Sequence, residues 1–211
     1  TLGQSDFSSI PTFMFTGIDF YHGANSTLNG SGAVGGAIDL NSNALFTQGF
    51  NVYATQHVGS YGKSFSGIRA SYGNEQWKAY AVGFYNRVRN DFEVSYRNTT
   101  YQQSNASSRL AGILTAIRYY LKPTRSITTE IWYNNHDREV QPVIGDFNRS
   151  DILLDRNLRA NLTFSNAGKS GFLKAGLSFI SDQQTFNNSS STNLFRYRSD
   201  ISYEYTKIAW W

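Results

Sequence analysis

The glycine-rich segment from Gly30 to Gly35 has the spacing G-x-G-x-x-G, which holds a pyrophosphate in dinucleotide-binding proteins. That chemistry requires a helix that opens on the glycines and binds the phosphates at its N-terminus, and an acidic residue about 20 positions later. Here residues 36–40 form an alternating strand pattern, and the downstream acids Asp39 and Glu75 come too early and too late. The sequence therefore predicts a strand after the glycines and no nucleotide site.

Metal binding and acid–base catalysis are the other chemistries to weigh. The histidines are far apart in sequence and lack a second ligand at metal-binding spacing, apart from Asp137 beside the last of them: His22, His57 and His136. Glu130 and the charged run 137–139 are of types that are mostly solvated or ion-paired on a protein surface. There is no cysteine and no G-x-S-x-G motif to supply a nucleophile. We expect no metal, no cofactor and no enzymatic activity.

The composition is that of a β-rich protein with little surface charge. Aromatic residues make up 16% of the 211 residues, charged residues also only 16%, and there are three prolines. The net charge of +4 is spread over single Lys and Arg residues, which argues against nucleic acid as a partner. No run of 18 apolar residues occurs, but a transmembrane β-barrel hides its apolar band in alternate positions and is compatible with a mean hydropathy of −0.43.

From residue 50 onward the sequence is a series of segments with a period of two, which predicts strands. In one of them Ile68, Ala70 and Tyr72 alternate with Arg69 and Ser71. The cleanest is the last, where apolar and aromatic residues alternate with charged or small polar ones. The predicted strands cover residues 50–58, 65–72, 77–88, 109–121, 127–134, 158–164, 173–179 and 195–205.

The lengths of the longest of these segments, 50–58, 77–88, 109–121 and 195–205, favour a membrane barrel over a soluble sandwich. Strands of about 9–13 residues can cross a bilayer at a tilt, whereas strands in globular proteins average about 5 or 6 residues. Trp77, Tyr119, Tyr133 and Tyr205 stand near predicted strand ends, where interfacial aromatics are expected. The fold class that we predict is all-β, a transmembrane antiparallel β-barrel of which about eight strands are present.

The connections between the predicted strands alternate between short and long, as they do on the two sides of an outer-membrane barrel. Short turns are predicted at 73–76, 122–126 and 165–171. Long polar connections are predicted at 89–108, 135–152 and 181–193. We expect the long connections outside the cell and the short turns in the periplasm.

The segment from Ile18 to Leu40 resembles the end of the plug domain of TonB-dependent outer-membrane receptors. In that family a strand, a turn, a Leu-Tyr-Gly element and a Gly-Gly-Val-Ile-Asn strand follow in this order, and here they correspond to residues 18–21, 22–23, 28–30 and 35–39. His22, Ala24 and Asn29 replace the Arg, Pro and Tyr that are usual there. The glycines that carry the resemblance are Gly23, Gly30, Gly32, Gly35 and Gly36.

Two later segments extend the resemblance into the strand region. Residues 90–93, Asn-Asp-Phe-Glu, and residues 132–142, beginning Trp-Tyr-Asn-Asn-His-Asp-Arg-Glu, are similar to segments after the third and fifth barrel strands of receptors of the cobalamin and siderophore type. Gln141 stands where the family has Pro. The resemblance implies that residues 1–46 are the C-terminal part of a plug domain and that residues 47–211 are the N-terminal strands of a β-barrel in the bacterial outer membrane.

The function that the resemblance implies is TonB-dependent active uptake of a scarce nutrient. This nutrient is either an iron chelate, the complex of iron with a siderophore, or a cobalamin-like molecule. The implied partners are the TonB–ExbB–ExbD energy-coupling complex, outer-membrane lipid and lipopolysaccharide, the small-molecule metal chelate or cobalamin, and a surface lipoprotein. As ligand contacts we predict Tyr96, Arg97, Tyr101 and Arg138, because aromatic rings supply contact area and Arg pairs with acidic groups in a bidentate manner.

An alternative is a non-transporting outer-membrane or surface β-barrel protein used for adhesion or assembly, in which the glycine-rich segment is a mere turn. The position of residues 18–40 discriminates, because the transporter interpretation requires them inside the barrel. An eight-stranded barrel has room inside only for its own side chains. We therefore expect these strands to be part of a longer polypeptide.

Overall fold

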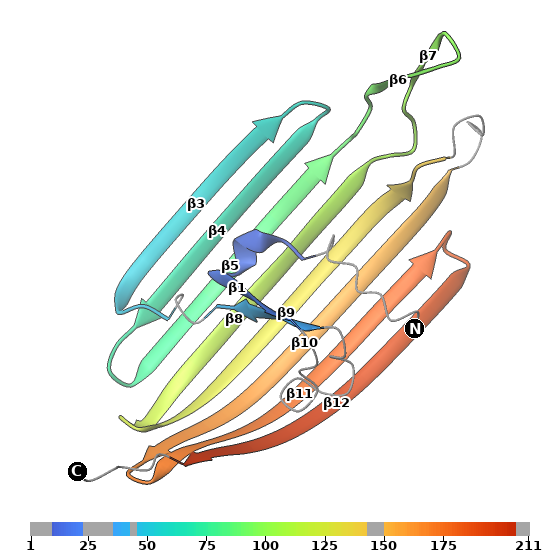
Figure 1. The fold of residues 1–211 in the computed structure, drawn as a ribbon. Coiled ribbons are helices and arrows are strands. Elements are labelled where there is room, and N and C mark those ends of the chain that lie inside the picture. Colours follow the sequence, from blue (N-terminus) through green and yellow to red (C-terminus); the bar gives the residue numbers. More distant parts are fainter. Residues whose placement is uncertain (1–9, 23–35, 43–45, 143–149, 206–211) are drawn as a thin grey trace.

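The computed structural model describes residues 10–22, 36–42, 46–142 and 150–205, which form an all-β fold built on one large sheet (Figure 1). Eight strands pair antiparallel in the order β12-β11-β10-β9-β8-β5-β4-β3. Their bounds are β3 Gly49–Gly59, β4 Lys63–Gly73, β5 Trp77–Val88, β8 Ser108–Lys122, β9 Arg125–Val140, β10 Asp151–Gly168, β11 Gly171–Phe186 and β12 Ser190–Tyr205.

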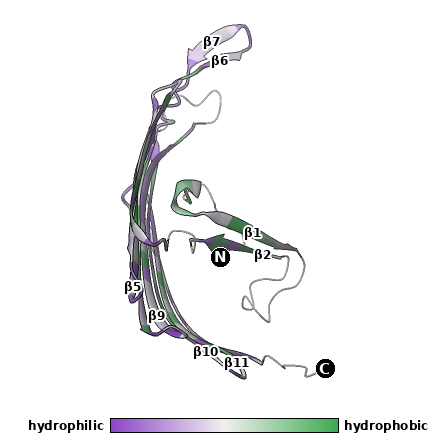
Figure 2. Ribbon diagram, turned by 90° about the vertical axis from the view of Figure 1, so that its left-hand side faces the viewer, coloured by the Kyte–Doolittle hydropathy of each residue, from purple (hydrophilic) through white to green (hydrophobic). Residues whose placement is uncertain are grey.

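Two small hairpins accompany the large sheet. A 3-10 turn, η1 (Thr12–Met14), leads into β1 (Gly17–His22), which pairs antiparallel with β2 (Gly36–Asn41). We call η1, β1 and β2 together the N-terminal unit. The second hairpin, β6 (Glu93–Tyr96) and β7 (Thr99–Gln102), is inserted between β5 and β8. The large sheet is curved, and the N-terminal unit lies on its concave side (Figure 2).

The sheet is open, with β3 and β12 at its two edges. Among the described residues the strands therefore do not close into a barrel. The part of the prediction that is confirmed is the all-β class with eight antiparallel strands in one sheet.

Register and burial together define the two faces of the sheet. Tyr80, Val82 and Phe84 in β5 are buried, and so are Ala116 and Leu114, which stand opposite Tyr80 and Val82 in β8. These side chains face the concave side and form the core with the N-terminal unit. Because side chains alternate along a strand, the residues between them, such as Ile113, face the convex side.

The strand predictions from sequence are confirmed, and so are β1 and the strand expected after the glycines. Gly36 opens β2 with φ 150°, and a Cβ there would lie 2.5 Å from the Tyr21 carbonyl oxygen, so only glycine fits this close approach. The other four glycines of the resemblance, Gly23, Gly30, Gly32 and Gly35, lie outside the described residues.

The connections at one end of the sheet are all short, as predicted: 74–76, 123–124 and 169–170. We call this the turn end. At the opposite end, the loop end, the connections are 60–62, 89–107, 141–150 and 187–189.

Two of the predicted long connections are wrong. Residues 135–140 belong to β9, so that connection is only 141–150. The connection predicted at 181–193 is a tight turn at 187–189, because β11 and β12 extend toward each other to Phe186 and Ser190. Asn187 and Asn188 adopt positive φ, which Asn tolerates, and the Asn187 side-chain oxygen accepts a hydrogen bond from the Ile152 amide.

Candidate functional site

The convex face carries a broad band of exposed apolar side chains. Within the sheet, Ile113, Tyr133 and Leu158 stand opposite one another on neighbouring strands. Leu177 is 58% exposed although β11 has neighbours on both sides. The band comprises Phe50, Val52, Ile68, Tyr72, Ile113, Ile117, Ile131, Tyr133, Leu162, Leu177, Phe195, Tyr197 and Ile201. An exposed apolar patch of this extent marks a surface that meets lipid or another protein.

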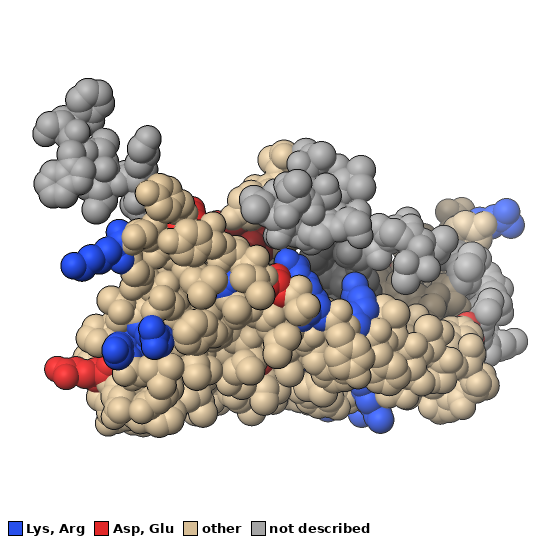
Figure 3. Space-filling model, turned by 90° about the horizontal axis from the view of Figure 1, so that it is seen from below, with Lys and Arg blue, Asp and Glu red and all other residues tan. Residues whose placement is uncertain are grey.

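Different side chains border the band at its two ends. At the turn end the rings of Trp77 and Tyr119 are in tilted contact with centroids 4.3 Å apart, and Gln76 donates a hydrogen bond to the Tyr119 hydroxyl. At the loop end the same face carries exposed arginines, among them Arg87 and Arg109. Seen from below the view of Figure 1, charged side chains occupy only a small part of the surface of the sheet (Figure 3).

The concave face is polar over β9 to β12. Arg138 donates to Asp155 at 2.8 Å, and both side chains are largely buried. The Asp182 carboxylate forms ion pairs with Arg159, at 3.4 Å, and with Arg196, at 3.3 Å. One carboxylate of β11 therefore links both neighbouring strands, β10 and β12. The distribution of polarity is thus inverted relative to a water-soluble sheet, with ion pairs inside the curve and apolar side chains outside.

The N-terminal unit docks on the concave face through apolar contacts. Met14 is fully buried, and Phe15 packs edge-to-face on Trp132 with ring centroids 5.6 Å apart. Tyr80 and Val82 complete the contact from β5. This explains why β5 has its large apolar residues on the concave face, whereas β10 to β12 have most of theirs on the convex face.

A second contact holds the backbone of η1. Arg69 in β4 donates to the Phe13 carbonyl through both Nε, at 2.9 Å, and Nη2. Its guanidinium also lies 4.2 Å from the centre of the Phe13 ring. Gly67 makes room for that ring, because a Cβ at this position would lie 2.6 Å from it. The glycine and the arginine together form a seat for Phe13.

A polar cluster anchors the end of β2 to the sheet. The Tyr80 hydroxyl lies 2.8 Å from Ser42 Oγ and 2.7 Å from Glu130 Oε2, and Ser42 Oγ lies 3.0 Å from the same carboxylate oxygen. Phe46 packs edge-to-face on the Tyr80 ring. We call Ser42, Tyr80 and Glu130 the anchor cluster. Sequence reasoning missed it because its members come from three segments whose register was unknown.

The predicted ligand residues fall in two places. Tyr96 and Arg97 lie at the tip of the β6–β7 hairpin, with the guanidinium 5.2 Å from the ring centre, and Tyr101 in β7 stands opposite Val94. Tyr101 shares a face of this hairpin with Val94, its partner directly opposite. Tyr96 is two residues after Val94 and is therefore on the same face. Arg138 is instead in β9, close to the loop end of the concave face and paired with Asp155.

No group of three His, Cys, Asp or Glu side chains at metal-binding distances occurs among the described residues. His136 is buried on the concave face with Nε2 2.8 Å from Ser108 Oγ. Asp137 faces the convex side, because neighbouring residues of a strand point to opposite faces. The two residues that were adjacent in sequence therefore do not form a joint site.

Comparison with protein-family models and with curated proteins finds no match to this chain. In the described residues no helix is long and apolar enough to span a membrane. The class that the fold and the two faces define is an all-β protein with a curved antiparallel sheet, whose convex face is apolar and exposed and whose concave face is polar over β9 to β12.

Proposed function

We propose that this chain forms part of the wall of an outer-membrane β-barrel that takes up a scarce nutrient, with the N-terminal unit as part of a plug inside it. The polar concave face then lines the lumen, and the apolar convex face meets lipid. Energy for uptake comes from a TonB-type complex acting on the plug. The substrate class that we propose is an iron chelate or a cobalamin-like molecule.

The observation that carries the proposal is the position of the N-terminal unit. It is docked on the concave face, by an apolar contact and by the anchor cluster, while the convex face is left uncovered by the described residues. A soluble sheet would bury its more apolar face first, because that removes the most apolar area from water. Here the unit covers only the apolar patch of the concave face over β5, β8 and β9, and the larger apolar surface of the convex face stays uncovered, which makes physical sense if lipid covers it.

The dimensions of the apolar band agree with a bilayer. In β12 the convex residues from Phe195 to Tyr205 span ten residue steps, which at about 3.4 Å each is roughly 34 Å along the strand. With a tilt of about 40° this gives a height of roughly 26 Å, near the apolar height of about 25 Å in outer-membrane barrels. The eight main strands have 11–18 residues, enough to cross and to continue beyond the membrane.

The open edges at β3 and β12 fit the same proposal. In a bilayer an unpaired strand edge is costly, because no water is present to satisfy its backbone groups. We therefore propose that further strands complete the barrel between β12 and β3. The alternative function, a non-transporting barrel for adhesion or assembly, would need the same closure but no docked unit inside.

Uptake in cells tests the transport proposal. Cells that express or lack the protein are supplied with a panel of labelled ferric chelates and with cobalamin, with and without a protonophore that removes the energy source. We expect the uptake of one nutrient to require both the protein and the energised membrane. Outer-membrane localisation without energised uptake of any of them would favour adhesion or assembly.

A tether tests whether the N-terminal unit must move. The chain has no cysteine, so the pair Phe13→Cys and Gly67→Cys can be crosslinked without side reactions. The pair Thr47→Cys and Ser71→Cys, whose oxygens are 2.8 Å apart, is the matched control, because it holds the linker after β2 and not the unit itself. Only the first crosslink should block uptake, and reduction should restore it.

A further inference from the structure

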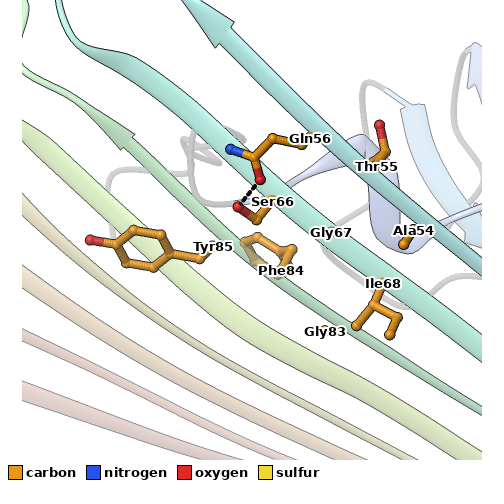
Figure 4. Close-up of a pocket in the computed structure, with 9 residues that line it drawn as sticks. All are labelled: Ala54, Thr55, Gln56, Ser66, Gly67, Ile68, Gly83, Phe84 and Tyr85. Atoms are coloured by element: carbon orange, nitrogen blue, oxygen red, sulfur yellow. Dashed lines mark hydrogen bonds between the residues drawn. The ribbon is translucent and has the colours of Figure 1, made fainter.

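A hollow of about 550 Å³ opens on the sheet between β3, β4 and β5 (Figure 4). The convex-face residues Ala54 and Gly83 form its floor, and the space above them is open because neither has a long side chain. Ile68 and Tyr85 stand beside it. A Cβ on Gly83 would meet only the Ile68 side chain, at 3.7 Å, so the space there is free of backbone. The hollow lies within the exposed apolar band.

Two arginines stand at the loop end of this hollow. Arg87 follows Tyr85 by two residues on β5 and so points to the same face about 7 Å farther along. Its partner directly opposite on β8 is Arg109. Like charges directly opposite each other on a sheet destabilise it. Neither arginine forms an ion pair in the part of the chain that the structure describes, although Asp137 stands opposite Arg109 on the β9 side.

We propose that the hollow and the two arginines bind one phosphate-bearing lipid, with an acyl chain in the hollow and the phosphate between Arg87 and Arg109. The proposal rests on the proposed membrane location of the convex face. An anion between the guanidinium groups would convert their repulsion into two charge-assisted pairings, for which the planar Arg fork is suited. Gln56, hydrogen-bonded to Ser66 at the same hollow, offers polar atoms to the headgroup side.

Lipid is favoured over a soluble phosphate compound because the charged and the apolar parts of the site are continuous on one face. The hollow belongs to the apolar band, and the arginines lie where that band ends. A free phosphate would use only the arginines. A lipid without phosphate would use only the hollow.

Binding is measured by native mass spectrometry of the intact protein in mild detergent. The probes are phosphatidic acid, diacylglycerol with the same chains, and inorganic phosphate. We expect tight binding of phosphatidic acid alone. The joint Arg87→Gln and Arg109→Gln variant should weaken it by about tenfold or more, since each charge-assisted bond contributes roughly that factor. Gly83→Leu, which fills the hollow, should weaken it by about tenfold through lost apolar burial.

Arg125→Gln is the matched control, because Arg125 lies at the turn end of the same sheet and binds Asn166 instead. It should leave phosphatidic acid binding unchanged. Equal binding of diacylglycerol, equal binding of inorganic phosphate, or no loss in either variant would overturn the proposal. Fractionation of the unchanged protein tests the membrane location separately, so failure of the lipid site is distinguishable from failure of the proposed function.

Discussion

Ser42→Ala should loosen the N-terminal unit from the sheet. The Ser42 hydroxyl is buried and lies 3.0 Å from Glu130 Oε2 and 2.8 Å from the Tyr80 hydroxyl. Tyr80 and Glu130 also bond each other at 2.7 Å and remain satisfied in the variant. The loss is therefore close to that of one hydrogen bond to a charged group, about 1.5–3 kcal/mol. This corresponds to roughly a 10- to 150-fold increase in the opening equilibrium.

Amide hydrogen exchange of β2 measures that opening, because its backbone amides exchange when the unit leaves the sheet. Ser108→Ala is the matched control, because the Ser108 hydroxyl is hydrogen-bonded to His136 within the large sheet and not to the N-terminal unit. Exchange of β2 should accelerate in Ser42→Ala and stay unchanged in Ser108→Ala. Equal exchange in both variants would refute the anchoring role of the cluster.

Three further outcomes follow from the faces of the sheet. Gly67→Val should displace the Phe13 ring and cost about 1–3 kcal/mol of docking free energy. The measurement is the midpoint temperature at which the N-terminal unit leaves the sheet, which should fall. Leu162→Arg on the convex face should cost about 2–4 kcal/mol in denaturant unfolding from lipid vesicles, whereas Asn161→Arg on the concave face should cost much less. Joint Arg97→Ala and Arg138→Ala should weaken nutrient binding while the barrel still inserts; unchanged affinity would place the binding site elsewhere.

Much of the strand pattern could be predicted from the sequence because the apolar band repeats every second residue. The prediction failed where that signal ends. Residues 135–139 and 181–185 are polar on both faces, so no alternation marks them as strands. They are strands because the backbone ladder continues past the apolar band and pairs Asp182 with arginines on both neighbouring strands.

The site was less predictable than the strands. The β6–β7 hairpin was missed because its turn places Arg97 and Asn98 at positive φ, a conformation that Arg rarely adopts. The seat of Phe13 and the anchor cluster depend on which residues of distant strands meet, and register cannot be read from alternation alone. Gly67 had a sequence signal only as a glycine within a strand, which often marks a close approach by another segment.

Residue-by-residue accessibility along β8 tests the central claim most directly. Single cysteines from Ile113 to Tyr119 carry spin labels, in a chain that has no other cysteine, and the protein is reconstituted in lipid bilayers. Collisions with oxygen report lipid, and collisions with a water-soluble nickel chelate report water. We predict a period of two, with oxygen favoured at Ile113, Ile117 and Tyr119 on the convex face. Water exposure at these positions, or no periodicity, would contradict a lipid-facing convex surface.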